Sequence, residues 1–288
     1  MTSTTRSLPA GLATLVVALA MTGLAACSSA SPNSAKAPPK NCKPKHSGVQ
    51  TLKKGTLTVS TNASPPYSIK KGDSFNGVDD QILSKLAAME CLTLDEQAIA
   101  PAGLIANVQS KRADAGAGGI YYTAQRAESL SLTVPMYRDG MALLSKKGLS
   151  SLADLKGKKV GVIQGYLWNA DLQKALGSGA VKLYQSSDGL MNDLKNGRVD
   201  AGVFTNAEAS YRLAQPVGKG LQSETFVPAQ QVQASIAKSN VVLALSKGNT
   251  SLTNALNADI KSLVAEGAVA KALSSNGMSA SLAGGTPA

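Results

Sequence analysis

The chain alternates between short apolar, β-branched runs and stretches in which apolar residues recur at helical spacing. The first such unit starts near residue 56, and its order is strand, helix, strand, helix, strand. Its predicted elements are strands over 56–61, 92–99 and 113–117, and helices over 77–90 and 101–111, the last opened by a proline in its first turn. This order predicts a largely parallel sheet covered by helices, that is, an α/β fold.

The same pattern restarts after residue 157. The second unit is predicted to have strands over 158–163, 181–185 and 199–204, and helices over 166–176 and 188–196. Extended runs over 141–145 and 241–245 are predicted to cross between the units, and helices over 252–265 and 269–274 follow. Two α/β units joined by two crossings predict two lobes around a cleft, with the ligand beyond the carboxyl ends of the strands.

The N-terminus has the pattern of an export signal. Arg6 precedes an apolar run over 11–21 that is too short to span a bilayer, which needs about 20 residues. The run ends in Leu24-Ala25-Ala26-Cys27, which resembles the lipobox of bacterial lipoproteins. We therefore expect cleavage of a signal peptide over 1–26 and acylation of Cys27, which would anchor the chain to the outer face of the cytoplasmic membrane. The alternative is an ordinary secretory signal with an incidental cysteine.

Residues 28–48 are rich in Ser, Pro, Lys, Ala and Asn and lack hydrophobic periodicity. Such a stretch buries too little apolar surface to offset its ordering entropy, so we expect a lipidated, flexible linker over 27–50. Its lysines either contact anionic lipid headgroups or are simply solvated.

Two cysteines remain after Cys27 is assigned to the lipid, namely Cys42 and Cys91. An even pair in an exported chain predicts a disulfide, and two free thiols are the alternative. The single histidine, His46, lies in the linker with no second soft ligand at chelating spacing, so neither a metal site nor a cofactor is predicted.

Positive charge is in excess, with 29 Lys and Arg against 18 Asp and Glu and a net charge of +11. These residues are scattered and form no basic stripe interleaved with aromatic residues, which argues against nucleic-acid binding. A basic surface suits an anionic membrane, an acidic ligand or the cell wall.

Several short motifs, in order, extend this interpretation. They are Pro65-Pro66-Tyr67, Gly77-Val78-Asp79, 108–115, 123–127, Pro135-Met136-Tyr137, 152–162, 196–201 and 245–249. With these motifs the chain from about 55 to 278 resembles the family-3 extracellular solute-binding proteins, which serve ABC importers of polar amino acids. The resemblance implies a periplasmic-binding-protein-like Venus-flytrap fold with a double hinge. Lobe one would comprise 51–137 plus 242–279 and lobe two 143–237, with a loose tail over 280–288.

The resemblance also implies partners: a small-molecule ligand, and an ABC permease in the membrane on which the closed, monomeric protein docks. It implies that the Arg126 guanidinium binds a ligand carboxylate through two parallel hydrogen bonds. Backbone N–H groups of the loop with Gly118, Gly119 and Tyr121 would complete an anion nest. The alternative is a surface arginine that pairs with Glu128 or solvent.

Aromatic side chains are expected to form the walls of the site. The resemblance places Tyr67 against the ligand, and puts Tyr166 and Trp168 where the second lobe supplies contacts, with Gln164 as a hydrogen-bond partner. For Trp168, packing against the helix that it starts is an equal alternative.

The chain departs from the family pattern where the ligand ammonium is usually held. Thr205, followed by Asn206, stands where an aspartate is expected, and Glu208 is the nearest replacement. Asp79 and Asp80 are further candidates, although Asp79 suits a structural role at a helix start. We therefore expect a polar amino acid or close derivative, or else a carboxylate whose nitrogen is absent, alkylated or acylated, because an unpaired buried ammonium is costly.

Two competing functions follow from the same fold. A dehydratase-like enzyme would need positioned acid and base groups, and the body of the chain offers no His, no cleft Cys and no paired carboxylate motif. The prediction is therefore a binding protein and not an enzyme. A sensory lipoprotein that signals through a membrane receptor is not separated from an importer component by any feature of the sequence.

Overall fold

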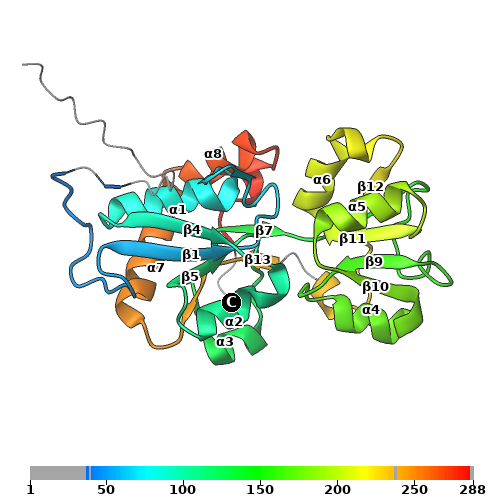
Figure 1. Cartoon of the computed structure of the whole chain (residues 1–288), viewed down its shortest axis with the longest axis horizontal. Coiled ribbons are helices and arrows are strands. Elements are labelled where there is room, and N and C mark those ends of the chain that lie inside the picture. The colour runs from blue at the N-terminus through cyan, green and yellow to red at the C-terminus, as the bar shows by residue number, and fades with distance from the viewer. Residues whose placement is uncertain (1–36, 39, 237–238, 286–288) are drawn as a thin grey trace, which may run out of the picture. The chain divides into compact units, whose positions relative to one another are not determined.

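The computed structural model describes residues 37–38, 40–236 and 239–285 (Figure 1). The predicted signal peptide, the lipobox and Cys27 lie outside these residues, as does the end of the predicted tail, 286–288.

The first sheet is built mainly from the first α/β unit. Its order is β4-β1-β5-β14-β6, in which β4, β1 and β5 are parallel and β14 runs antiparallel to both of its neighbours, β5 and β6. The strands are β1 (Thr56–Thr61), β4 (Thr93–Ala98), β5 (Ala115–Ala117), β6 (Leu130–Leu132) and β14 (Ala244–Ser246). All six residues of β1 are buried, as expected for a strand inside a sheet with helices on both faces.

The second sheet repeats this arrangement with other strands. Its order is β10-β9-β11-β8-β12, again with three parallel strands and then one strand, β8, that runs antiparallel to both of its neighbours. The strands are β8 (Met141–Ser145), β9 (Val160–Ile163), β10 (Val181–Tyr184), β11 (Ala201–Thr205) and β12 (Gln222–Thr225). Each sheet and its helices form one lobe, so the two lobes share one topology.

A two-stranded antiparallel ribbon links the lobes: β7 (Tyr137–Asp139) pairs with β13 (Ser239–Val241), and Figure 1 shows it between the two sheets. The prediction of crossing strands over 141–145 and 241–245 was therefore wrong in position. All residues of 141–145 are buried within the second sheet, and 244–246 belongs to the first. The two predicted segments are apolar because they lie inside the sheets, whereas the ribbon that links the lobes is more polar.

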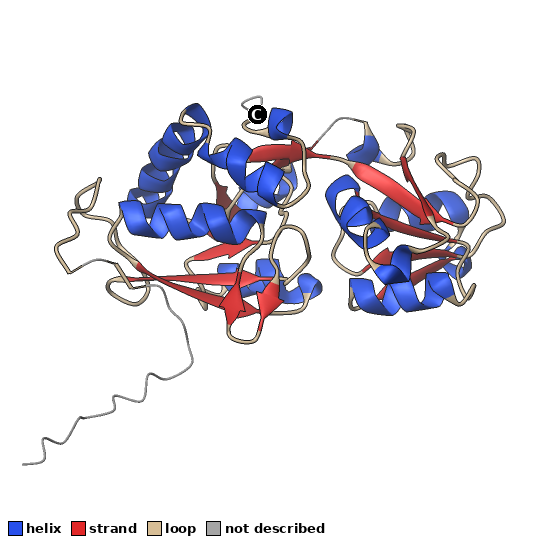
Figure 2. Ribbon diagram, turned by 90° about the horizontal axis from the view of Figure 1, so that it is seen from above, coloured by secondary structure: helices blue, strands red, loops and turns tan. Residues whose placement is uncertain are grey.

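Helices cover both faces of each sheet (Figure 2). On the first lobe they are α1 (Val78–Met89), η1 (Pro101–Gly103), α2 (Leu104–Gln109), α3 (Ala124–Ser129), α7 (Thr250–Ala265), α8 (Ala268–Ser275) and η5 (Ala280–Leu282). The second lobe carries α4 (Asn169–Leu176), η2 (Ser178–Ala180), α5 (Ser187–Lys195), α6 (Asn206–Leu213), η3 (Pro216–Gly218) and η4 (Gln233–Ser235). A short hairpin of β2 (Lys70–Lys71) and β3 (Ser74–Phe75) precedes α1.

Helices α3 and α6 were missed by the sequence pattern. Both are short and mostly polar, so neither has a clear apolar stripe. Their start signals were present: Thr123 and Thr205 each accept a hydrogen bond from the backbone N–H three residues later.

The start of the described chain is fixed to the first lobe. Cys42 and Cys91 form the predicted disulfide. The Lys45 amide donates to the Met89 carbonyl (2.9 Å), and His46 Nδ1 lies 2.6 Å from Glu90 Oε1. The prediction of a flexible linker reaching residue 50 was therefore wrong for the part that follows Cys42.

The end of the chain is also ordered further than predicted. Ala283 forms a β-bridge with Tyr137, and the Gly284 amide donates to the Met136 carbonyl (2.7 Å). The prediction of a loose tail from residue 280 was wrong as far as 285, because these backbone groups pair with the linking ribbon and the residue before it. Within the described residues, no helix combines the length and apolar character needed to cross a membrane.

The disulfide is expected to contribute substantially to stability. Replacing both cysteines, by Cys42→Ser with Cys91→Ser, releases a loop that spans 49 positions and should lower the free energy of unfolding by about 4 kcal/mol. Urea unfolding of the purified protein with and without the pair checks this. An unchanged midpoint and slope would show that the crosslink does not constrain the unfolded chain.

Candidate ligand-binding cleft

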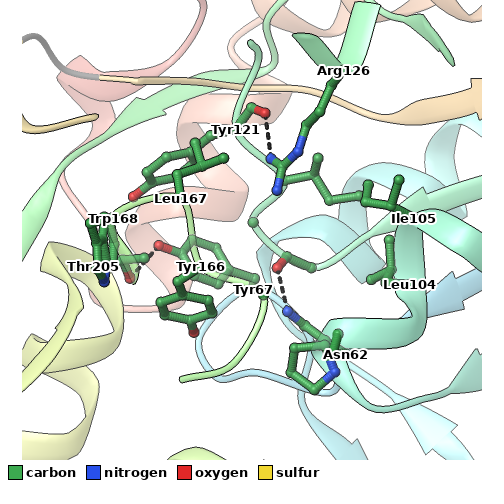
Figure 3. Close-up of a pocket in the computed structure, with 16 residues that line it drawn as sticks. Asn62, Tyr67, Leu104, Ile105, Tyr121, Arg126, Tyr166, Leu167, Trp168 and Thr205 are labelled. Carbon is green, nitrogen blue, oxygen red and sulfur yellow. Dashed lines mark hydrogen bonds between the residues drawn. The ribbon is translucent and has the colours of Figure 1, made fainter. Parts of the chain in front are cut away.

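A cavity lies between the two lobes, at the carboxyl ends of their strands (Figure 3). It contains about 640 Å³ of space, part of it open to solvent. Its lining includes residues that directly follow strands: Asn62 after β1, Gly118 after β5, and Thr205 at the end of β11. Loops at this edge are free to carry varied side chains, which is where ligands bind in open α/β sheets.

Arg126 enters the cavity from α3. Thr123 caps this helix, accepting a hydrogen bond from the Arg126 amide (3.0 Å), and the guanidinium donates through Nη1 to the Tyr121 carbonyl (2.7 Å). Burial lowers the pKa of Arg126 to about 10, which leaves it charged at neutral pH. Among the described residues no carboxylate pairs with it, Glu128 included. The lining of the cavity therefore includes a guanidinium cation with unused hydrogen-bond donors.

Three aromatic rings meet on one side of the cavity. Tyr166 and Trp168 lie 5.3 Å apart between ring centroids at 90°, and Tyr121 and Trp168 lie 6.3 Å apart at 67°. Tyr121 comes from the first lobe and the other two from the second. Trp168 is 1% exposed, yet its ring lines the cavity, so the two alternatives for it, packing and ligand contact, do not exclude each other.

Tyr67 connects the lobes beside the cavity. Its hydroxyl donates to the Asp139 carboxylate and lies 2.6 Å from Thr205 Oγ1 in the second lobe. Its ring packs tightly on the cavity loop: a Cβ on Gly119, where φ is +76°, would lie 2.7 Å from the ring. Position 119 therefore requires glycine for two reasons: its backbone conformation and the closeness of the Tyr67 ring.

A second connection between lobes is made by Glu208, which is fully buried. Its carboxylate accepts hydrogen bonds from Ser64 Oγ of the first lobe (3.2 Å), from Tyr166 Oη (2.7 Å) and from Ser187 Oγ. Burial raises its pKa, and these hydroxyl donors oppose the shift. Glu208 does not line the cavity, contrary to its predicted place as a partner for a ligand ammonium.

The predicted anion nest is occupied by the protein itself. Gly118 and Gly119 donate their amide N–H groups to Asp79 Oδ2 (2.8 and 2.9 Å), and Tyr137 donates its hydroxyl to Asp79 Oδ1. The two glycines line the cavity, but the prediction that these N–H groups serve the ligand was wrong. Asp79 at the start of α1 takes the structural role that the sequence favoured.

Two other predicted residues also lie outside the lining. Gln164 accepts a hydrogen bond from Gln185, and Asn206 Oδ1 accepts one from Thr225 Oγ1 (3.2 Å). The predicted residues that the fold brings together at the cavity are Tyr67, Gly118, Gly119, Tyr121, Arg126, Tyr166, Trp168 and Thr205.

Within the described chain, one group of metal-ligating type occurs, away from this cavity. His46, Glu90 and Asp259 place ligand atoms within 4.8 Å of one another. The carboxylates already have neighbours in the protein, since His46 Nδ1 lies 2.6 Å from Glu90 Oε1 and Lys45 Nζ lies 3.4 Å from Asp259 Oδ1. This network holds the N-terminal segment on the first lobe. Spacing along the sequence did not reveal that these three side chains lie close together.

The sequence pattern of the bacterial extracellular solute-binding proteins, family 3, matches residues 57–276. This chain belongs to that family. The family-3 protein described here has the two-lobed Venus-flytrap fold predicted for it. It is similar to a solved ancestral arginine-binding protein bound to glutamine, with a TM-score of 0.70, 26% identity, and coverage of 78% of this chain and 99% of the other.

Curated relatives of this solute-binding protein include amino-acid binders. It is 31% identical over 216 residues to the L-arginine-binding protein of Pseudomonas aeruginosa, covering 71% of this chain and 81% of that one. It is 26% identical over 228 residues to ABC transporter arginine-binding protein 1 of Escherichia coli, covering 78% and 90%.

Other residues of the cleft of this family-3 protein were missed by sequence reasoning. One apolar wall is formed by Pro101, Ala102, Leu104 and Ile105, and Leu167 faces it from the second lobe. These residues lie within or beside elements whose apolar positions look like ordinary core, so the only available signal was that Pro101 and Ala102 follow a parallel strand.

The pKa of Asp139 gives a test of the buried contact between the linking ribbon and Tyr67 in this protein. Burial raises its pKa from 3.8 to about 6, despite hydrogen bonds from Tyr67 and the Gly140 amide. The folded state therefore binds a proton more tightly than the unfolded state, and stability present below pH 4 is lost as pH rises through 6. Between pH 4 and 7.5, wild type should lose up to about 3 kcal/mol relative to Asp139→Asn.

Urea unfolding of wild type and Asp139→Asn at several pH values measures this difference. Asp73→Asn, on the exposed turn between β2 and β3, is a control for the loss of one negative charge. A constant gap between wild type and Asp139→Asn from pH 4 to 7.5 would contradict the raised pKa.

Proposed function

We propose that this protein captures a small solute of the polar amino-acid class, bearing a carboxylate, between its two lobes and delivers it to the membrane permease of an ABC importer. The observation that carries the proposal is Arg126, a half-buried guanidinium in the cleft with no carboxylate partner among the described residues. A planar guanidinium with free donors is the group best suited to bind a carboxylate through two parallel hydrogen bonds.

The arrangement of the cleft supports capture by closure. Arg126 and Tyr121 come from one lobe, and Tyr166, Trp168 and Thr205 come from the other. A ligand that contacts both sets is held only when the lobes are together, and it therefore shifts the population toward the closed form. The links through Tyr67 and Glu208 add to that form.

The names of relatives support the ligand class and the role in transport. They are named as binding proteins for arginine, histidine or cystine. The described cleft lining contains no His, Cys or carboxylate that would act as a catalytic acid, base or nucleophile. We therefore propose binding without turnover.

We also propose that the protein acts as a monomer on the outer face of the cytoplasmic membrane, held there by a lipid on Cys27. The sequence around Cys27 supports the anchor. The disulfide at Cys42 supports a short tether, since the chain is fixed to the first lobe from that point onward.

Replacing Arg126 tests the proposed site. Thermal unfolding of purified protein is measured against a panel of amino acids, their derivatives and simple carboxylates. A ligand at a hundredfold excess over its Kd should add about 2.7 kcal/mol of stability. Arg126→Ala should abolish the shift, because the carboxylate loses its counter-ion and both hydrogen bonds. Arg126→Lys keeps the positive charge but cannot form two parallel hydrogen bonds, so it should retain part of the thermal shift. A shift that survives Arg126→Ala, or a flat response from folded wild type across the panel, contradicts the proposal.

Replacing Cys27 tests the anchor. Cys27→Ser removes the thiol that would carry the lipid, so the protein should move from the membrane fraction to the soluble fraction and lose incorporation of labelled fatty acid. Cys42→Ser is the control, because it removes a different cysteine and should leave the labelling intact. Labelling that persists in Cys27→Ser contradicts the assignment.

A further inference from the structure

We propose that the cleft selects an organic carboxylate that carries no positively charged nitrogen, such as an N-acylated amino acid or a 2-oxo acid, over the free amino acid. This inference rests on the proposed function and specifies its ligand. It depends on how charge is distributed around the cavity.

The cavity has one charged lining residue in the described structure, and it is a cation. Arg126 contributes a positive charge, and no Asp or Glu lines the space. A ligand with a single carboxylate neutralises the guanidinium. A free amino acid brings the same carboxylate together with an ammonium group, whose charge no carboxylate of the lining would balance.

Three carboxylates lie near the cavity, but each is already engaged by donors of the protein. Asp79 accepts the amides of the Gly118–Gly119 loop and a tyrosine hydroxyl. Asp139 accepts the Tyr67 hydroxyl and the Gly140 amide. Glu208 accepts three hydroxyl groups. None of the three lines the cavity, so none of them offers its carboxylate directly to an ammonium group in that space.

The polar side chains of the lining are likewise engaged. The Asn62 amide donates to the Gly118 carbonyl (3.0 Å) and accepts from the Ser64 amide (3.2 Å). Tyr121 Oη donates to the Gly140 carbonyl (3.1 Å), and Tyr166 Oη donates to Glu208. An ammonium group needs acceptors for three N–H bonds, and the lining side chains offer it only neutral oxygens, with no carboxylate to balance its charge.

Two lining side chains carry N–H donors that have no partner among the described residues. Besides the guanidinium, the indole N–H of Trp168 is buried and has no hydrogen-bond partner among the described residues. Donors without acceptors favour an anion whose nitrogen has been replaced by, or covered with, a carbonyl group. The apolar wall of Leu104, Ile105 and Leu167 then suits an apolar or planar ligand body (Figure 3).

Aromatic rings raise one competing ligand class, the fully N-methylated amino acids. A quaternary ammonium has no N–H groups and binds to ring faces. Its own carboxylate would neutralise Arg126, but its ammonium would add a positive charge that no carboxylate of the lining balances. A monoanion, by contrast, leaves the cavity neutral. We therefore favour the monoanion and keep the quaternary compounds as an outcome of the test.

Matched ligand sets test the proposal by isothermal titration of purified full-length protein in mild detergent. One set is L-leucine, N-acetyl-L-leucine, 4-methyl-2-oxopentanoate and N,N,N-trimethyl-L-leucine. A second is L-arginine with N-acetyl-L-arginine, and a third is L-phenylalanine with its N-acetyl and 2-oxo counterparts. The acetylated or oxo member should bind at least tenfold tighter than the free amino acid, in an Arg126-dependent manner.

The outcomes separate this inference from the proposed function. If a free amino acid binds as tightly as its acetylated form or more tightly, and Arg126→Ala abolishes binding, the ligand class is wrong and the proposed function stands. Tightest binding of the trimethylated compound also overturns the monoanion. If no member of any set binds to folded protein, both the inference and the proposed function fail.

Thr205 allows the missing charge to be restored. It lines the cavity and caps α6, and both Asp and Asn serve well as helix caps. Thr205→Asp adds a carboxylate at the cavity, and Thr205→Asn is the matched uncharged control. The ratio of affinities, free amino acid over acetylated form, should rise at least tenfold in Thr205→Asp relative to Thr205→Asn. Equal ratios in the two variants would contradict the inference.

Discussion

Three carboxylates are buried around the cleft, and their need for hydrogen-bond donors determines much of the local structure. An unsatisfied buried carboxylate is costly, so each draws donors from elements that are distant in sequence. Asp79 ties the start of α1 to the loop after β5 and to Tyr137 at the linking ribbon. Asp139 ties that ribbon to Tyr67, and Glu208 ties the second lobe to Ser64. The cavity is the space left between loops positioned in this way.

The same constraint shapes what the cavity offers to a ligand. Acidic groups are present nearby, but the protein uses them to hold its own loops and lobes together. What remains exposed to the ligand is Arg126, a set of aromatic rings and an apolar wall. The lining therefore carries one cation and no carboxylate, although similar proteins are named as arginine-binding proteins.

Much of the candidate site followed from sequence motifs, and the misplaced part has a common physical cause. Arg126 and the four aromatic residues, which were selected by resemblance to the family, line the cavity. Gln164, Asn206 and Glu208 were chosen for nearness in sequence to such ends. A rotation of one residue along a helix or turn redirects a side chain from the cleft to the interior, and the sequence does not specify that direction.

The sequence alone determined the α/β class, the repetition of one topological unit, the Cys42–Cys91 disulfide and the identity of the cavity cation. These follow from local periodicity, cysteine number and motif spacing, which need no knowledge of distant contacts. Only the tertiary structure decided which strands link the lobes, that the tail pairs with the linking ribbon, and that the Gly118–Gly119 amides serve Asp79. Each of these depends on a hydrogen bond between residues far apart in the chain, whose donors and acceptors meet only in the folded protein.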